Sequence, residues 1–208
     1  MKQKALLLLS GGIDSPVAGL FAKQKGFDLE AIHFSQEPFT DNTPEKKSLA
    51  SAKKLGLKEM IVVNIGQELK TITDVTYREY YFILMKRLMI KISEKIAEKK
   101  GISFLITGES MGQVSSQTLS NLNNINNSVK IEILRPLIFM NKQEIVDESI
   151  KQGFFEISKG REMCDVLASG KPKTISKINK VLVEEKKCKM DLLVKSSLKN
   201  VRIEKIVD

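Results

Sequence analysis

The feature that most constrains the fold is a short aliphatic run that ends in a glycine turn. Residues Ala5–Leu9 are followed by Ser10-Gly11-Gly12-Ile13-Asp14-Ser15 and then by Pro16. An uninterrupted aliphatic run of this length is typical of a strand buried on both faces of a parallel sheet. Serine caps helices and proline is favoured in the first helical position, so we predict a helix over 15–26, capped by Ser15. The sequence therefore predicts a strand, a tight loop and a helix.

The predicted loop has the features of an anion-binding site. It follows a parallel strand, at the sheet edge where ligands bind. Gly11 and Gly12 let the backbone approach an anion, and the helix start adds free N–H groups. The loop is not a Walker A motif, because no lysine follows the glycines. Asp14 would repel phosphate unless a cation lay between them, so we predict Mg²⁺ bound at Asp14 together with a nucleotide; the alternative is that Asp14 only caps the helix.

The rest of the chain alternates between strand and helix patterns. This alternation predicts an α/β fold with a parallel five-stranded sheet and helices on both faces. Predicted strands cover 5–9, 29–34, 60–65, 103–107 and 131–134, and predicted helices cover 15–26, 44–55, 77–100 and 141–152. The asparagine-rich stretch 120–128 is predicted to be a loop or a frayed helix end. We assign 1–170 to one domain and 171–208 to a basic, mainly helical C-terminal extension packed on it, with a helix over 175–187.

Composition narrows the class of protein. Two cysteines and one histidine make a disulfide scaffold and a zinc site improbable, and they predict a cytoplasmic location. No apolar run approaches the roughly 18 residues that span a bilayer, so no membrane association is expected. The net charge is +9, and residues 171–208 carry eleven Lys/Arg and five Asp/Glu. This basic tail favours either a polyanionic partner such as tRNA or an ordinary solvated lysine-rich surface.

Longer motifs identify a family resemblance. The S-G-G-x-D-S loop resembles that of the PP-loop ATP pyrophosphatases, which bind ATP and release pyrophosphate. Further segments, in order along the chain, resemble the ThiI family of tRNA 4-thiouridine synthetases. These segments are His33-Phe34, Tyr77-Arg78, T-G-E-S-M-G-Q-V-S-S-Q-T-L over 107–119, L-R-P-L-I over 134–138 and Asn141-Lys142. The resemblance implies a Rossmann-like fold of the adenine nucleotide alpha hydrolase type.

The resemblance also implies a set of site residues. Asp14 would hold Mg²⁺ through the nucleotide phosphates, and Lys142 matches a lysine that is important for activity. Taken without the resemblance, His33 would be a core histidine. Lys86, on a mostly apolar helix, would supply a point charge for phosphate, and the alternative is a snorkelling surface lysine. The alternative for Gly108 is a simple turn at a strand end. The implied ATP-binding residues are Leu8, Leu9, Ser10, Gly11, Gly12, Asp14, Ser15, His33, Phe34, Lys86, Gly108 and Gln117.

The cysteines differ in their predicted roles. Cys164 matches the cysteine that takes part in sulfur delivery, so it joins Asp14 and Lys142 as a predicted catalytic residue; a lone cysteine would otherwise be a buried small residue. A single chain with two cysteines cannot supply three ligands to an iron–sulfur cluster. Cys188 is interpreted either as a resolving partner or as an exposed helix position.

The predicted activity is an ATP-dependent tRNA sulfurtransferase. It would adenylate a uridine carbonyl and replace its oxygen with sulfur from a persulfide donor such as a cysteine desulfurase or a rhodanese, with a link to thiamine thiazole synthesis. We expect a stand-alone form without THUMP and rhodanese domains, so tRNA would be presented by a separate THUMP-type protein or by the basic tail. A homodimer is a further expectation from the family. Three alternatives stay open: an amidotransferase-type ligase acting on a small molecule, a non-catalytic nucleotide-binding subunit of a split thiolation system, and a basic RNA-binding module.

Overall fold

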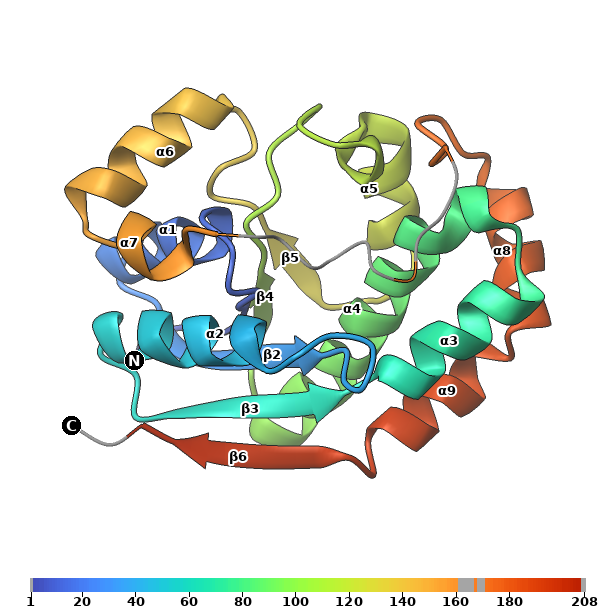
Figure 1. The fold of residues 1–208 in the computed structure, drawn as a ribbon, viewed down its shortest axis with the longest axis horizontal. Helices are drawn as coiled ribbons and strands as arrows, with labels where there is room; N and C mark the ends of the chain where they lie inside the picture. Colours follow the sequence, from blue (N-terminus) through green and yellow to red (C-terminus); the bar gives the residue numbers. More distant parts are fainter. Residues whose placement is uncertain (1, 161–166, 168–170, 207–208) are drawn as a thin grey trace.

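A six-stranded sheet organises the chain (Figure 1). The computed structural model describes residues 2–160, 167 and 171–206. Five strands are parallel, which confirms the predicted α/β class, and the sixth is an antiparallel edge strand that the sequence did not predict. The order is β5-β4-β1-β2-β3-β6. The strands are β1 (Lys4–Leu8), β2 (Asp28–Ser35), β3 (Glu59–Asn64), β4 (Phe104–Ile106), β5 (Glu132–Leu134) and β6 (Val201–Lys205).

Helices bury both faces of this sheet. Successive residues of β1 point to opposite faces, so Leu6 enters one hydrophobic cluster and Leu7 the other. This explains why the strands are continuously apolar rather than alternating. One face carries α1 (Asp14–Gln24), α2 (Thr43–Lys54), α6 (Lys142–Lys151) and α7 (Phe155–Ser158); the other carries α3 (Gly66–Val75), α4 (Tyr81–Lys100), α5 (Leu119–Asn126), α8 (Ile178–Lys187) and α9 (Met190–Ser197). Among the described residues, no helix combines the length and the apolar character needed to cross a bilayer.

The start of α1 corrects one prediction. The helix begins at Asp14, its N-cap residue is Ile13, and no side chain caps it. Ser15 is therefore not the cap; its hydroxyl accepts a hydrogen bond from the Ser10 amide at 3.0 Å. Pro16 consequently stands in the third helical position. The loop thus uses Ser15 to close on itself, which a propensity for capping does not reveal.

The asparagine-rich stretch forms a helix, α5, rather than a loop. Thr118 caps it by accepting from the Asn121 amide at 3.3 Å. Asn121 and Asn124 are buried, and their side-chain amides donate to backbone carbonyls of the tail, including that of Ser176 at 2.8 Å from Asn124. Tertiary hydrogen bonds therefore override the weak helix propensity of asparagine here. The sequence prediction missed the helix α3 altogether, and it included the 3₁₀ turn Arg78–Tyr80 in the helix predicted over 77–100.

The tail is anchored on α4 by a buried ion pair. Arg87 is 1% exposed, and its guanidinium contacts the Glu185 carboxylate of α8 at 2.5 Å. The same guanidinium donates to the Asn124 carbonyl of α5. Lys91 adds a second cation at 3.4 Å from Glu185. One arginine therefore joins α4, α5 and α8 on the face of the sheet opposite α1.

We predict that Glu185→Ala destabilises the fold strongly. The change leaves the Arg87 guanidinium buried without a carboxylate, and breaking a buried pair in this way costs about 3–5 kcal/mol. Urea unfolding measures the loss. Asp191→Ala is the matched control, because Asp191 lies 3.9 Å from the same Lys91 but its side chain is 89% exposed; its effect should stay within about 0.5 kcal/mol. Equal losses in the two variants would contradict this account of the tail.

Candidate active site

The candidate site lies at the point in the sheet where the strand order reverses. From β1 the chain adds β2 and β3 on one side, whereas β4 and β5 lie on the other. In open parallel sheets, ligands bind at such a switch point, beyond the carboxyl ends of the two central strands. The loops after β1 and β4 meet here. A Cβ on Gly108 would lie 2.6 Å from the Ser15 nitrogen, so only glycine lets the second loop approach the first turn of α1.

The glycine loop is held in a bent conformation with one side open. Gly11 has φ +70°, and a Cβ there would lie 2.6 Å from the Pro44 carbonyl oxygen. The hydroxyls of Ser10 and Ser15 lie 3.1 Å apart across the loop. Among the described residues, a Cβ on Gly12 would meet only the Ser10 hydroxyl, at 3.5 Å, so their packing does not require glycine at this position. This open side and the helix start beside it fit the approach of a phosphate group.

Two of the predicted catalytic residues meet beside this loop. The Lys142 ammonium lies 2.7 Å from the Asp14 carboxylate, although the two residues are far apart in the sequence. Asp14 opens α1 and Lys142 opens α6, whose start is fixed by a capping box between Asn141 and Glu144. Both side chains are partly exposed, at 23% for Asp14 and 48% for Lys142. The pair is therefore open to a ligand.

Asp14 can serve a magnesium ion only together with other oxygen donors. Within the part of the chain that the structure describes, no cluster of three or more His, Cys, Asp or Glu side chains could hold a metal. Mg²⁺ commonly binds through one or two carboxylates and completes its shell with substrate phosphates and water. A single carboxylate next to an anion-binding loop fits this arrangement, with Asp14 as the protein ligand.

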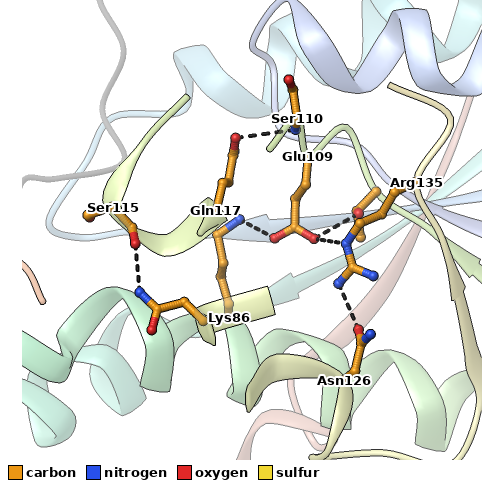
Figure 2. Close-up of polar contacts among 9 residues, drawn as sticks. Lys86, Glu109, Ser110, Ser115, Gln117, Asn126 and Arg135 are labelled. Carbon is orange, nitrogen blue, oxygen red and sulfur yellow. Dashed lines mark hydrogen bonds and ion pairs between the residues drawn. The ribbon is translucent and has the colours of Figure 1, made fainter. Parts of the chain in front are cut away.

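A buried carboxylate with two cations forms the far side of the site (Figure 2). Glu109 accepts from the Lys86 ammonium at 2.6 Å, the Arg135 Nε at 2.7 Å and the Thr107 hydroxyl at 3.1 Å. Burial alone would raise the pKa of Glu109, but Lys86 and Arg135 together outweigh burial and hold that pKa at about 2. The carboxylate is therefore charged throughout the physiological pH range.

The loop between Gly108 and Gln117 is closed by its own hydrogen bonds. The Ser110 amide donates to the Gln117 side-chain oxygen at 3.3 Å, and the Gly112 amide donates to the Gln117 carbonyl at 2.9 Å. The Ser110 hydroxyl donates to the Met140 carbonyl at 2.5 Å, which joins this loop to the segment before α6. The Gln117 side chain is thereby held against the Ser110 amide (Figure 2).

Sequence reasoning assigned no role to Glu109 or Arg135. Both stand within three residues of the carboxyl end of a short parallel strand, β4 or β5, and the quoted T-G-E-S and L-R-P-L segments contain them. Their positions could have identified them, because charged residues that follow adjacent parallel strands meet at the same edge of the sheet.

The His33 side chain holds the start of the glycine loop. Its Nδ1 lies 2.9 Å from the Leu9 carbonyl oxygen and 2.9 Å from the Ser48 hydroxyl. Because a carbonyl oxygen only accepts, the ring carries its proton on Nδ1, and Nε2 is left as a buried atom without a partner among the described residues. Burial, with a smaller contribution from Arg202, lowers the pKa of His33 to about 4 even though the Leu9 contact opposes this.

The other residues predicted to contact the nucleotide differ in solvent exposure. Phe34 is 8% exposed and belongs to the core cluster on the α4 side, whereas Leu8 is partly buried at the end of β1. Contacts of Leu8, Leu9, His33 and Phe34 with adenine stay predictions.

The structure tests the predicted role of only one of the two cysteines, Cys188. Cys164 lies outside the described residues. Cys188 is 3% exposed, so the interpretation as an exposed helix position is wrong. Burial, reinforced by Glu185, raises the pKa of the Cys188 thiol to about 11. Because the thiolate is the reactive form, this environment disfavours a resolving role for Cys188.

We predict that His33 makes the fold sensitive to mild acid. Its pKa is about 4 in the folded protein, against an ordinary value of 6.5 for a solvated histidine, so the unfolded chain binds the proton first as the pH falls. The stabilisation is complete above about pH 6.5 and is lost towards pH 4, by about 3 kcal/mol. Urea unfolding at several pH values measures this, with His33→Gln as control because the sequence holds one histidine. Parallel curves for the two proteins between pH 7 and pH 4.5 would contradict the prediction.

Comparison with known proteins places these features in a family. The family model described as "Thiamine biosynthesis protein (ThiI)" matches residues 1–190. A probable tRNA sulfurtransferase of Alkaliphilus oremlandii is 41% identical over 209 residues, covering 98% of this chain and 53% of the relative. A second, from Halothermothrix orenii, is 38% identical and covers 91% of this chain and 49% of the relative. The chain therefore spans about half the length of the curated relatives it matches.

A solved structure agrees with the sequence matches. The crystal structure of a 4-thiouridine synthetase–RNA complex with bound ATP superposes with a TM-score of 0.91 at 33% identity, over 97% of this chain and 55% of that one. The strand order, the S-G-G-x-D-S loop and the family match over residues 1–190 lead to one conclusion: the chain belongs to the ThiI family.

Proposed function

We propose that the protein activates a uridine carbonyl of tRNA with ATP and replaces the oxygen with sulfur, forming 4-thiouridine. The observation that carries this proposal is the Asp14–Lys142 pair beside an open glycine loop at the switch point of the sheet. Support also comes from relatives, which are named probable tRNA sulfurtransferases, and from the 4-thiouridine synthetase that was solved with RNA and ATP.

Different parts of the site would bind different parts of Mg·ATP. Backbone N–H groups of Gly11 and Gly12 and of the first turn of α1 would bind the phosphates, as helix starts do for anions. Lys86 would supply a positive charge from α4, on the far side of the crevice. Mg²⁺ held by Asp14 would neutralise charge that develops on the leaving pyrophosphate. The fixed Gln117 amide completes this side of the site.

The proposed chemistry has two displacements. The uridine O4 attacks the α-phosphorus of ATP, the bond to the β-phosphate oxygen breaks, and pyrophosphate leaves. A sulfur nucleophile then adds to C4, the C4–O bond breaks, and AMP leaves. Donors already oriented towards the phosphates stabilise the first transition state because they need no reorganisation during the reaction. Lys142, next to Asp14, is suited to stabilise charge on the oxygens around the α-phosphorus.

The sulfur step extends beyond the described residues. We infer that the Cys164 thiolate takes the outer sulfur of a persulfide donor such as a cysteine desulfurase or a rhodanese and releases the donor's thiolate. When the outer sulfur of the Cys164 persulfide adds to C4, the product stays joined to Cys164 by an S–S bond, and an external thiol reductant breaks that bond to release 4-thiouridine. Free sulfide adds to C4 without this last step. Two sources of tRNA affinity are proposed: the basic tail, which holds +6 of the net charge of +9, and a separate THUMP-type protein. A homodimer and a cytoplasmic location remain part of the same proposal.

A reaction with unmodified tRNA tests the proposal. We expect the wild-type protein with ATP, Mg²⁺ and sulfide to release pyrophosphate and form thiouridine in equal amounts. Asp14→Asn should lower both by about 100-fold, because it removes the charge that holds the metal. Asp74→Asn is the matched control: Asp74 is an exposed carboxylate that pairs with Lys70 on α3, at 2.5 Å.

The other outcomes separate the alternatives. Pyrophosphate without thiouridine would reject tRNA as the acceptor and favour a small-molecule substrate. Full activity of Cys164→Ser with ammonia in place of sulfide would favour an amidotransferase-type ligase. Binding of Mg·ATP without pyrophosphate release would favour a nucleotide-binding subunit.

A further inference from the structure

Glu109 is paired with one more cation than its charge requires. Lys86 reaches it from α4 and Arg135 from the segment after β5, so the three side chains together carry a net charge of +1. Figure 2 shows the two cations on opposite sides of the carboxylate. The side chains of Glu109 and Arg135 are 7% and 9% exposed, whereas that of Lys86 is 21% exposed. Lys86 is therefore the member of the group that faces outward.

Each carboxylate oxygen has its own partners. Oε1 accepts from Lys86, whereas Oε2 accepts from Arg135 and Thr107. The Arg135 guanidinium is fixed in addition by the Asn126 side chain, at 2.9 Å. Lys86 can therefore leave Oε1 without disturbing the contacts of Oε2. A buried carboxylate that lost its sole cation would be strongly destabilised, but here Arg135 remains to neutralise it.

The position of the group connects it with the phosphate loop. Glu109 directly follows Gly108, whose backbone lies against the first turn of α1. The next residue, Ser110, donates its amide to the Gln117 side chain and so ties the loop back on itself. The partly exposed Lys86 ammonium is therefore held beside the loops where the triphosphate is proposed to bind.

We propose that Glu109 is a positioning residue: it holds the Lys86 ammonium at the edge of the nucleotide crevice and releases it to the triphosphate, while Arg135 keeps the carboxylate neutralised. This inference rests on the proposed function only in that ATP is the ligand. Before ATP binds, Glu109 competes with the phosphates for Lys86. During the reaction, it restricts Lys86 to one place, so that the charge is aligned with the oxygens on which negative charge develops.

Glu109→Gln separates these two effects. It removes the competing charge, so the dissociation constant of Mg·ATP, measured by calorimetry, should fall by several-fold. It also frees the ammonium, so kcat for pyrophosphate release should fall by about 10- to 100-fold. A purely structural role would lower kcat only in proportion to the folded fraction, which circular dichroism measures, and would not tighten ATP binding.

A double-mutant cycle with Lys86→Met tests whether Glu109 acts through Lys86. If it does, Glu109→Gln should change neither the ATP dissociation constant nor kcat by more than about twofold once Lys86 is methionine, since the coupling is then already lost. Multiplicative losses in the cycle would overturn the proposal. So would a Glu109→Gln variant that keeps wild-type kcat and wild-type ATP affinity.

Two further variants serve as a control and as a substitute in the double-mutant cycle. Glu94→Gln is the matched control, because the Glu94 carboxylate accepts from the Lys130 and Ile131 amides, at 2.6 and 3.0 Å, at the opposite end of β5; it should leave kcat and ATP affinity unchanged. Where Glu109→Gln does not fold, Glu109→Asp enters the same cycle, since it keeps the charge but retracts the carboxylate. It should lower kcat by at least about fivefold, and only while Lys86 is present.

Failure of this inference is distinguishable from failure of the proposed function. A wild-type protein that binds Mg·ATP but forms no thiouridine would reject the proposed function and leave the cycle readable from the dissociation constants. A wild-type protein that forms thiouridine but shows no coupling between Glu109 and Lys86 would reject only the positioning role.

Discussion

The approach of the β4 loop to the first turn of α1 is the constraint on which the site depends. Gly108 has no side chain to separate the two segments, so the loop after β4 lies against the helix start that follows β1. The two strands are hydrogen-bonded neighbours and run in the same direction. Their carboxyl ends therefore bring the glycine loop and a charged loop together at one edge of the sheet. A side chain at position 108 would move Glu109, and with it the position of Lys86.

Opposite charges are grouped beside these two loops. Lys142 pairs with Asp14 on one side, and Lys86 and Arg135 pair with Glu109 on the other. Cations placed together without carboxylates would repel one another and would be costly to bury. The carboxylates thus allow several positive groups to be concentrated at one place. In the proposed function, a polyanionic ligand such as ATP would compete for the positive groups, and the excess of cations over carboxylates would favour that exchange.

The sequence predicted the framework of the fold better than the details of the site. Continuous aliphatic strands such as Ala5–Leu9 and glycine stops specified five parallel strands, because local patterns determine which segments are buried on both faces. The β6 strand was missed because its residues are mostly exposed and three of the five are charged. Only its pairing with β3 makes it a strand. Asp14 and Lys142 were identified from motifs, but their 2.7 Å contact depends on the packing of α6 against α1. Ser15 was misassigned as a cap because its real partner, Ser10, is a feature of the loop and not of the helix.

The tail supports the site indirectly, through Arg87, the residue next to Lys86. Lys86 and Arg87 are neighbours on α4, and adjacent residues on a helix point about 100° apart. Lys86 therefore faces Glu109 in the crevice while Arg87 faces Glu185 on α8 and the backbone of α5. The same α5 helix holds the tail through Asn121 and Asn124, and its Asn126 side chain fixes Arg135. Residues 171–206 are thus connected to both cations of Glu109, through α4 to Lys86 and through α5 to Arg135. A basic tail that looks like a simple polyanion-binding extension is, by these contacts, also part of the support for the proposed nucleotide site.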